Sequence, residues 1–192
     1  MRNFYVKHKI GLYATNYVYQ QSLNADSNEL RRFAVEIGDL VDKEKPVVYF
    51  DESSFNMWMR KNKTWMHPDE PIPVVLNKNR GENVTVYGAI GTCLPRALFC
   101  QTKVTNELAT IDFMKRLREL ANENMRPSES IHLILDNHAA HHTIRMRGVF
   151  GEHNIIPHFM PPYSPQFNSI EALWGIIKRK VKDKMALAPG TI

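Results

Sequence analysis

Two apolar runs that each end in an aspartate are the strongest constraint on how this chain folds. Val47–Phe50 are followed by Asp51, and Ile131–Leu135 are followed by Asp136. Apolar runs of this length without polar alternation predict strands that are buried on both faces, as in the parallel part of an α/β sheet. Because ligands gather outside the carboxyl ends of such strands, we expect both carboxylates to lie at one edge of the sheet.

A third acid stands at the start of a helical pattern. Glu171 opens a segment with a continuous apolar stripe made of Ile170, Leu173, Trp174, Ile177 and Val181. At 3.6 residues per turn, Glu171 lies at the edge of that stripe, on the flank that carries Gly175, Lys178 and Lys182. Three carboxylates brought together would supply the hard oxygen ligands that Mg²⁺ or Mn²⁺ prefers. A structural reading stays open for each acid, because acids also stabilise first helical turns and turns after strands.

The remaining pattern predicts an α/β fold with a mixed sheet flanked by helices. Helices are expected over about 26–41, 110–124 and 143–150 and from 171 onward, and strands over 47–51, 64–66, 84–90, 97–100, 131–135 and 155–160. The order is a strand, a meander of strands and then alternating helices and strands, which favours one mixed sheet. We expect residues 1–43 to form an N-terminal arm, linker and helix, and residues 44–192 to form the main domain.

Composition narrows the class of partner. The formal net charge is +5, which indicates an anionic partner, with nucleic acid ahead of an acidic membrane surface. The start of the chain has no continuous apolar segment, and no run is long enough to span a bilayer, so neither a secretory signal nor a membrane anchor is expected. Cys93 and Cys100 are the only cysteines, which indicates no disulfide framework and a reducing compartment.

The acids stand in segments that resemble a known family. Met160–Trp174 resembles the third acidic motif of the mariner superfamily of DDE transposases, whose usual pattern is Pro-Tyr-Ser-Pro-x-Leu-Asn-Pro-Ile-Glu-x-x-Trp. Leu135–His141 resembles the second motif, Asp-Asn-Ala-x-x-His, and Phe50–Ser53 resembles the first. Between Asp136 and Glu171 lie 34 residues, the spacing of one main branch of that superfamily. The resemblance covers roughly residues 44–185.

The segment Arg60–Trp65 is also similar to the hairpin that precedes the next strand in that family. The chain departs from the family pattern at Phe167, Ser169 and His138, where Leu, Pro and Ala are usual, and at Asp69-Glu70, where a glycine often turns the hairpin. None of these departures removes a carboxylate of the three motifs.

The resemblance implies an RNase H-like fold, cleavage of a DNA strand, and transfer of the freed 3′-hydroxyl to target DNA with two Mg²⁺ or Mn²⁺ ions. It implies that Asp51 bridges the ions, that Asp136 holds one and that Glu171 holds the other. The expected active-site neighbours are Glu52, Asn137 and His141. The expected DNA contacts are Lys178, Arg179 and Lys182. A homodimer on DNA is expected by the same analogy, as is a nuclear location in a eukaryotic host and a cytoplasmic one otherwise.

Three alternatives stay open at this stage. The first is a domesticated descendant that binds DNA or other partners without cutting. The lack of room in residues 1–43 for paired helix-turn-helix modules favours it, and the intact set of three acids disfavours it. The second is an RNase H-like nuclease that acts on RNA or hybrid duplexes, which the third motif disfavours. The third is a zinc site at His138, His141 and His142, which is disfavoured because no cysteine or distant histidine stands at ligand spacing.

Overall fold

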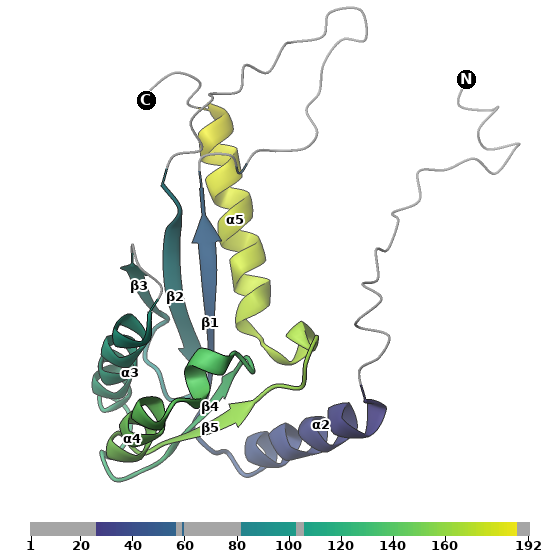
Figure 1. The fold of residues 1–192 in the computed structure, drawn as a ribbon, viewed down its shortest axis with the longest axis vertical. Coiled ribbons are helices and arrows are strands. Elements are labelled where there is room, and N and C mark those ends of the chain that lie inside the picture. Colours follow the sequence, from purple (N-terminus) through teal and green to yellow (C-terminus); the bar gives the residue numbers. More distant parts are fainter. Residues whose placement is uncertain (1–25, 57–58, 60–81, 103–105, 188–192) are drawn as a thin grey trace, which may run out of the picture.

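The computed structural model describes residues 26–56, 59, 82–102 and 106–187. The order of its elements matches the expected one (Figure 1). A helix comes first, a meander of strands follows, and helices then alternate with strands. They are α2 (Ser27–Asp42), β1 (Val47–Phe55), β2 (Val84–Gly91), β3 (Leu98–Thr102), α3 (Glu107–Ala121), β4 (Ile131–Leu135), η2 (Ala139–His142), α4 (Ile144–Glu152), β5 (Ile155–Phe159), η3 (Pro165–Phe167) and α5 (Ile170–Leu187).

The strands form one mixed sheet in the order β3-β2-β1-β4-β5. Strands β1, β2 and β3 pair antiparallel as a meander, whereas β1, β4 and β5 pair parallel. Parallel neighbours need long crossover connections, and α3 and α4 occupy the connections that lead into β4 and β5. The predicted mixed sheet flanked by helices is therefore confirmed.

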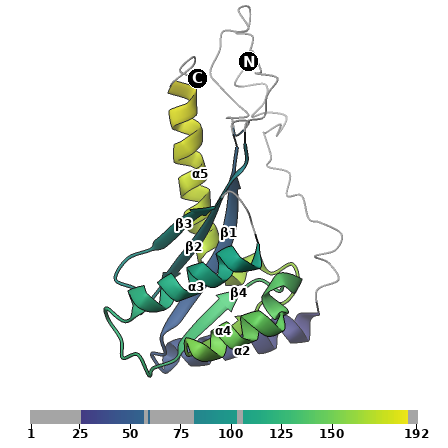
Figure 2. The same ribbon diagram turned by 60° about the vertical axis from the view of Figure 1, so that its left-hand side comes forward.

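Side-chain alternation along β1 divides the core between the two faces of the sheet. Val48 and Phe50 belong to the larger cluster, which packs against α3 and α4, while Val47 belongs to a smaller cluster on the other face with Phe33 of α2. Figure 2 shows α3 and α4 together on one side of the sheet. The first apolar run of the sequence is therefore buried on both faces, as expected.

Helix α2 is anchored to the far edge of the sheet. It begins after Asp26, whose side chain accepts a hydrogen bond from the backbone of the first turn, as the sequence predicts. The Phe33 ring meets the Phe167 ring edge-on, with 5.3 Å between centroids. Glu36 accepts a hydrogen bond from His158 of β5. The helix is thus tied both to β5 and to the segment that leads into α5.

Helix α5 lies against the middle of the sheet because β2 carries a glycine there. A Cβ atom on Gly88 would stand 2.6 Å from Cζ2 of Trp174 and 2.9 Å from Cδ1 of Ile170. No side chain larger than hydrogen fits without displacing the helix. Gly88 is also the β2 partner of Asp51. The close approach therefore brings the start of α5 next to the first predicted acid.

Two element boundaries differ from the sequence-based expectation. Strand β1 continues to Phe55 instead of ending at Asp51, because its pairing with β2 runs on to the end of the strand. Asp51 therefore lies within β1 and only Asp136 follows the end of its strand. Helix α3 begins at Glu107, three residues before the predicted cap Thr110, because the Asn106 side chain accepts the N–H of Ala109.

Several sequence-based predictions fall outside the described residues. These are the N-terminal arm, the strand at 64–66 and the hairpin at 60–65. Within the described ranges Cys93 and Cys100 are both free thiols. None of the helices in those ranges combines the length and the apolar character that crossing a bilayer requires.

Candidate active site

The Asp51 carboxyl is the electrostatic centre of the site. Its pKa is raised from 3.8 to about 6. Burial is the largest cause, and the negative charges of Glu171 and Asp136 contribute to the same rise. The backbone N–H of Glu52 and the indole of Trp174 act in the opposite direction. The Trp174 indole nitrogen nevertheless lies outside hydrogen-bonding geometry and has no partner among the described residues. The charges of acids from β4 and α5 therefore act on the pKa of Asp51 in β1.

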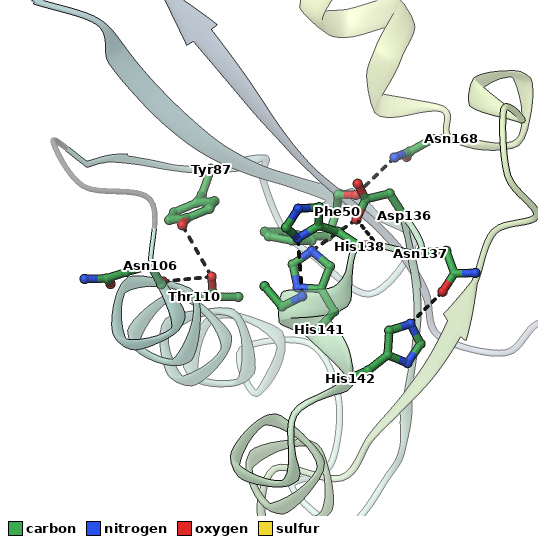
Figure 3. A network of polar contacts seen from close by, with 11 residues as sticks. Phe50, Tyr87, Asn106, Thr110, Asp136, Asn137, His138, His141, His142 and Asn168 are labelled. Carbon is green, nitrogen blue, oxygen red and sulfur yellow. Dashed lines mark hydrogen bonds and ion pairs between the residues drawn. The ribbon is translucent and has the colours of Figure 1, made fainter.

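The Asp136 carboxylate is held ionised by a buried histidine. Its oxygen lies 3.1 Å from Nε2 of His141, whose side chain is only 5% exposed. This hydrogen bond is the main cause that lowers the pKa of Asp136, and it outweighs the opposing effect of burial. The backbone N–H of His138 also donates to Asp136, at 3.4 Å. Figure 3 shows both histidines gathered against this carboxylate.

Glu171 lies in the first turn of α5, and its backbone N–H donates to the carbonyl of Asn168 at 3.0 Å. By sequence, either Asn168 or Ser169 can cap this helix with its side chain. The structure shows the Asn168 amide Nδ2 donating to the carbonyl of Phe50 at 3.0 Å. The Asn168 side chain does not cap the helix, because Oδ1, the atom that would accept a first-turn N–H, has no partner among the described residues.

A cavity of about 300 Å³ lies at this site. It is lined by the acids Asp51, Glu52 and Asp136 and by His141, together with Asn106 and Thr110 at the start of α3. Burial raises the pKa of Glu52, and His141 is the strongest of the charges that counteract this effect. Glu52 and His141, both expected beside the site, are thus brought together with Asp136. The α3 residues were not predicted, because no sequence signal marks the start of that helix as part of the site.

Asn137, the third expected active-site neighbour, has His142 as its side-chain partner. The Asn137 side-chain oxygen lies 2.6 Å from Nε2 of His142, whose ring stacks on Phe159 with 4.0 Å between centroids. His138 accepts the N–H of Ala140 with its ring nitrogen, so it caps the short helix η2. The three histidines considered for zinc therefore have three separate roles.

The expected DNA contacts all lie on α5. Arg179 is exposed, and Lys178 and Lys182 are half-buried. By helical spacing the two lysines share the flank of Glu171. Figure 1 shows α5 running alongside β1. A cationic strip therefore leads away from the acids along one helix.

The donor set is chemically suited to Mg²⁺ or Mn²⁺, since Asp51, Asp136 and Glu171 supply only hard oxygens. Burial, and after it the charges of Glu171 and Asp136, raise the pKa of Asp51, and a bound cation would counteract both effects. Among the described residues, however, no three acidic, histidine or cysteine side chains converge in a metal-binding arrangement. The acids are neighbours, but their carboxylates do not form a complete set of metal ligands.

A five-stranded mixed sheet with helices on both faces is the RNase H-like fold of transposase catalytic domains. The catalytic domain of Mos1 mariner transposase matches it with a TM-score of 0.53 at 12% identity, over 88% of this chain and 75% of that chain. The model of the family described as DDE superfamily endonuclease matches residues 46–188. The chain belongs to this family, and the resemblance to mariner transposases is confirmed.

Larger Mos1 assemblies show the same fold. The Mos1 transposase paired-end complex with left transposon end matches with a TM-score of 0.65 at 15% identity, over 94% of this chain. The Mos1 mariner paired-end complex with Mn matches with a TM-score of 0.58 at 18% identity, over 92% of this chain. This chain spans 56% of the transposase chain in each of these structures. No curated protein matches the sequence.

Proposed function

We propose that this chain is the catalytic domain of a cut-and-paste DNA transposase. One observation carries the proposal: Asp51 and Asp136 line the same cavity, and Asn168 joins Phe50, the residue before Asp51, to the backbone of Glu171. The segments that carry the three acids therefore meet at one place in a chain of the DDE endonuclease family. The likeness to transposase structures solved with transposon ends supports DNA as the substrate.

The proposed reaction has two displacements at phosphorus. First, water attacks a phosphodiester of the donor strand, the bond from phosphorus to the 3′-oxygen breaks, and a 3′-hydroxyl and a 5′-phosphate remain. Second, that 3′-hydroxyl attacks a phosphodiester of target DNA, so that one new bond to phosphorus forms and the target's own 3′-oxygen leaves. Each step exchanges one ester bond for another or for water, so no oxidant or energy source is needed.

Asp51, Asp136 and Glu171 would hold two Mg²⁺ or Mn²⁺ ions. Such ions stabilise the charge on the attacking and leaving oxygens of an in-line displacement. His141 keeps Asp136 ionised and fixes its orientation. Lys178, Arg179 and Lys182 would contact phosphates of the DNA, by analogy as part of a dimer.

The test is Mn²⁺-dependent transfer of a pre-cut oligonucleotide end into plasmid DNA. Asp136→Asn removes one proposed ligand. Asp39→Asn is the matched control, since Asp39 is an exposed acid of α2 paired with Lys43. We expect transfer by the wild type and by Asp39→Asn, and none by Asp136→Asn. Equal transfer by all three proteins would refute the assignment of the acids.

A second candidate function is DNA binding by a non-cutting descendant. It is favoured by the absence of a closed metal-binding group among the described residues. It predicts salt-sensitive DNA binding together with no Mn²⁺ binding. The two functions therefore separate on the metal alone, before any transfer is measured.

A further inference from the structure

Asn168 is a buried polar residue between the strand of one proposed acid and the helix of another. Its side chain is almost fully enclosed, at 3% relative exposure. The Nδ2 group donates to the carbonyl of Phe50, the residue before Asp51, across 118 positions of sequence. The backbone carbonyl of Asn168 accepts the N–H of Glu171 at 3.0 Å. Figure 3 shows the amide reaching the strand from the segment that precedes α5.

The Phe50 carbonyl has a particular place in the sheet. The parallel ladder of β1 and β4 begins with the bond from the His132 N–H to the Pro46 carbonyl, at 2.8 Å. Because bonding groups alternate along a strand, the carbonyl of Phe50 points toward β4 and would pair next with the N–H of Asp136. The register instead stops at Tyr49 and Ile134. The Asn168 amide thus occupies the position of the next rung.

This arrangement separates the two strands where their acids lie. If the ladder continued, Asp51 and Asp136 would be direct neighbours on adjacent strands. With Asn168 bound to the Phe50 carbonyl, β4 ends at Leu135 and the chain turns toward η2. The same residue fixes the first turn of α5 through Glu171. One residue therefore links the segments of all three proposed ligands, through its side chain at Phe50 and through its backbone carbonyl at Glu171.

The residue is not arranged for stability alone. Its Oδ1 atom is buried and has no hydrogen-bond partner among the described residues. A buried polar atom without a partner lowers stability, and such atoms call for an explanation other than packing. Phe167, the preceding residue, packs against Phe33 of α2, so the backbone on that side of Asn168 is held in place.

We propose that Asn168 is a positioning residue, which acts through the Phe50 carbonyl and the Glu171 backbone to set the relative positions of Asp51, Asp136 and Glu171, the proposed ligands of a divalent cation. The inference rests on the proposed function. It predicts that Asn168 contributes to metal affinity without touching the metal. Loss of partners that orient metal ligands lowers affinity by roughly 10- to 100-fold in other proteins.

The experiment compares Asn168→Leu, which keeps the volume but has no donor, with Thr92→Val. Thr92 makes the equivalent tie at the other end of β1, where its Oγ1 accepts the N–H of Val47 at 3.2 Å. Mn²⁺ affinity is measured from the loss of the free-ion resonance signal on titration with protein. Exchange of the Glu171 amide proton is measured by NMR in metal-free protein.

We expect Asn168→Leu to bind Mn²⁺ at least roughly tenfold more weakly and its Glu171 amide to exchange faster, while Thr92→Val changes neither. Unchanged affinity and exchange in Asn168→Leu would overturn the inference. If the wild type binds no Mn²⁺, the proposed function fails, and the Glu171 exchange rate still decides the role of Asn168. Should Asn168→Leu not fold, Asn168→Ala, which admits water at the Phe50 carbonyl, is measured in the same way.

Discussion

Replacing Asp51 by asparagine removes a charge that the fold holds at unfavourable energy. The pKa of Asp51 is raised from 3.8 to about 6 in the folded protein, chiefly by burial and then by Glu171 and Asp136. The folded state therefore binds the proton more tightly than the unfolded chain does. Stability is lost as the pH rises from about 4 to about 6, and the whole loss is present above that window. Asp51→Asn has no such loss.

The size of the effect follows from the shift. A rise from 3.8 to about 6 is about two pKa units, and each unit corresponds to about 1.4 kcal/mol, so the upper limit is about 3 kcal/mol. Asp51 is partly exposed, and water screens part of this energy, so we expect about 1–2 kcal/mol. For a domain of this size that corresponds to a Tm higher by roughly 2–8 °C above neutral pH.

The assay is thermal unfolding of metal-free protein in EDTA, followed by circular dichroism between pH 4 and pH 8. The Tm of Asp51→Asn should equal that of the wild type near pH 4 and exceed it increasingly up to pH 7. Asp136→Asn should behave in the opposite way, because His141 lowers the pKa of Asp136 and its ionised form stabilises the fold. Two results would refute this reasoning. One is a difference in Tm between Asp51→Asn and the wild type that does not vary with pH, and the other is a lower Tm of Asp51→Asn at pH 8.

Three further predictions concern the metal, the packing and the DNA. Mn²⁺ should raise the Tm of the wild type at pH 7.5, and it should raise it less at pH 5.5, where Asp51 takes up a proton. The Tm of Glu171→Gln should not change with Mn²⁺. A wild-type Tm that does not change with Mn²⁺ would contradict the proposed cofactor. Gly88→Ala should lower the free energy of unfolding in urea by about 1–3 kcal/mol, since its Cβ would overlap α5, and wild-type stability would show that the helix can move aside. Changing Lys178 and Lys182 together to glutamine should reduce the slope of log affinity against log salt by about 2 for duplex DNA, and an unchanged slope would exclude phosphate contacts there.

The sequence predicts those parts of the fold that depend on burial. The run Ile131–Leu135 is apolar except for His132, because it lies inside the sheet with neighbours on both sides. Its strand and the acid that follows can therefore be predicted from this segment alone. The stripe of α5 is readable for a similar reason, since one face of the helix packs on the sheet. The prediction that Asp136 and Glu171 belong to one site came from these patterns and from the family resemblance.

Other features depend on partners that are distant in the sequence. β1 continues through Glu52, Ser53 and Ser54, which are poor strand formers, because β2 provides backbone hydrogen bonds that override local preference. The role of Asn168 was also missed, since its partner lies 118 positions away. The available signal was the polar pair Asn168-Ser169 between the apolar residues Phe167 and Ile170.

The strand order has a consequence for how such a chain is synthesised. β1, β2 and β3 pair with their neighbours in sequence, so this meander can form while the ribosome is still translating the middle of the chain. The Asp136 strand joins it only after a crossover, and α5 must return to β1 last of all. Non-local contacts of this kind form slowly. A nascent or truncated product that lacks α5 consequently lacks Glu171, and the proposed acid site would be complete only after α5 has been synthesised and has docked on the sheet.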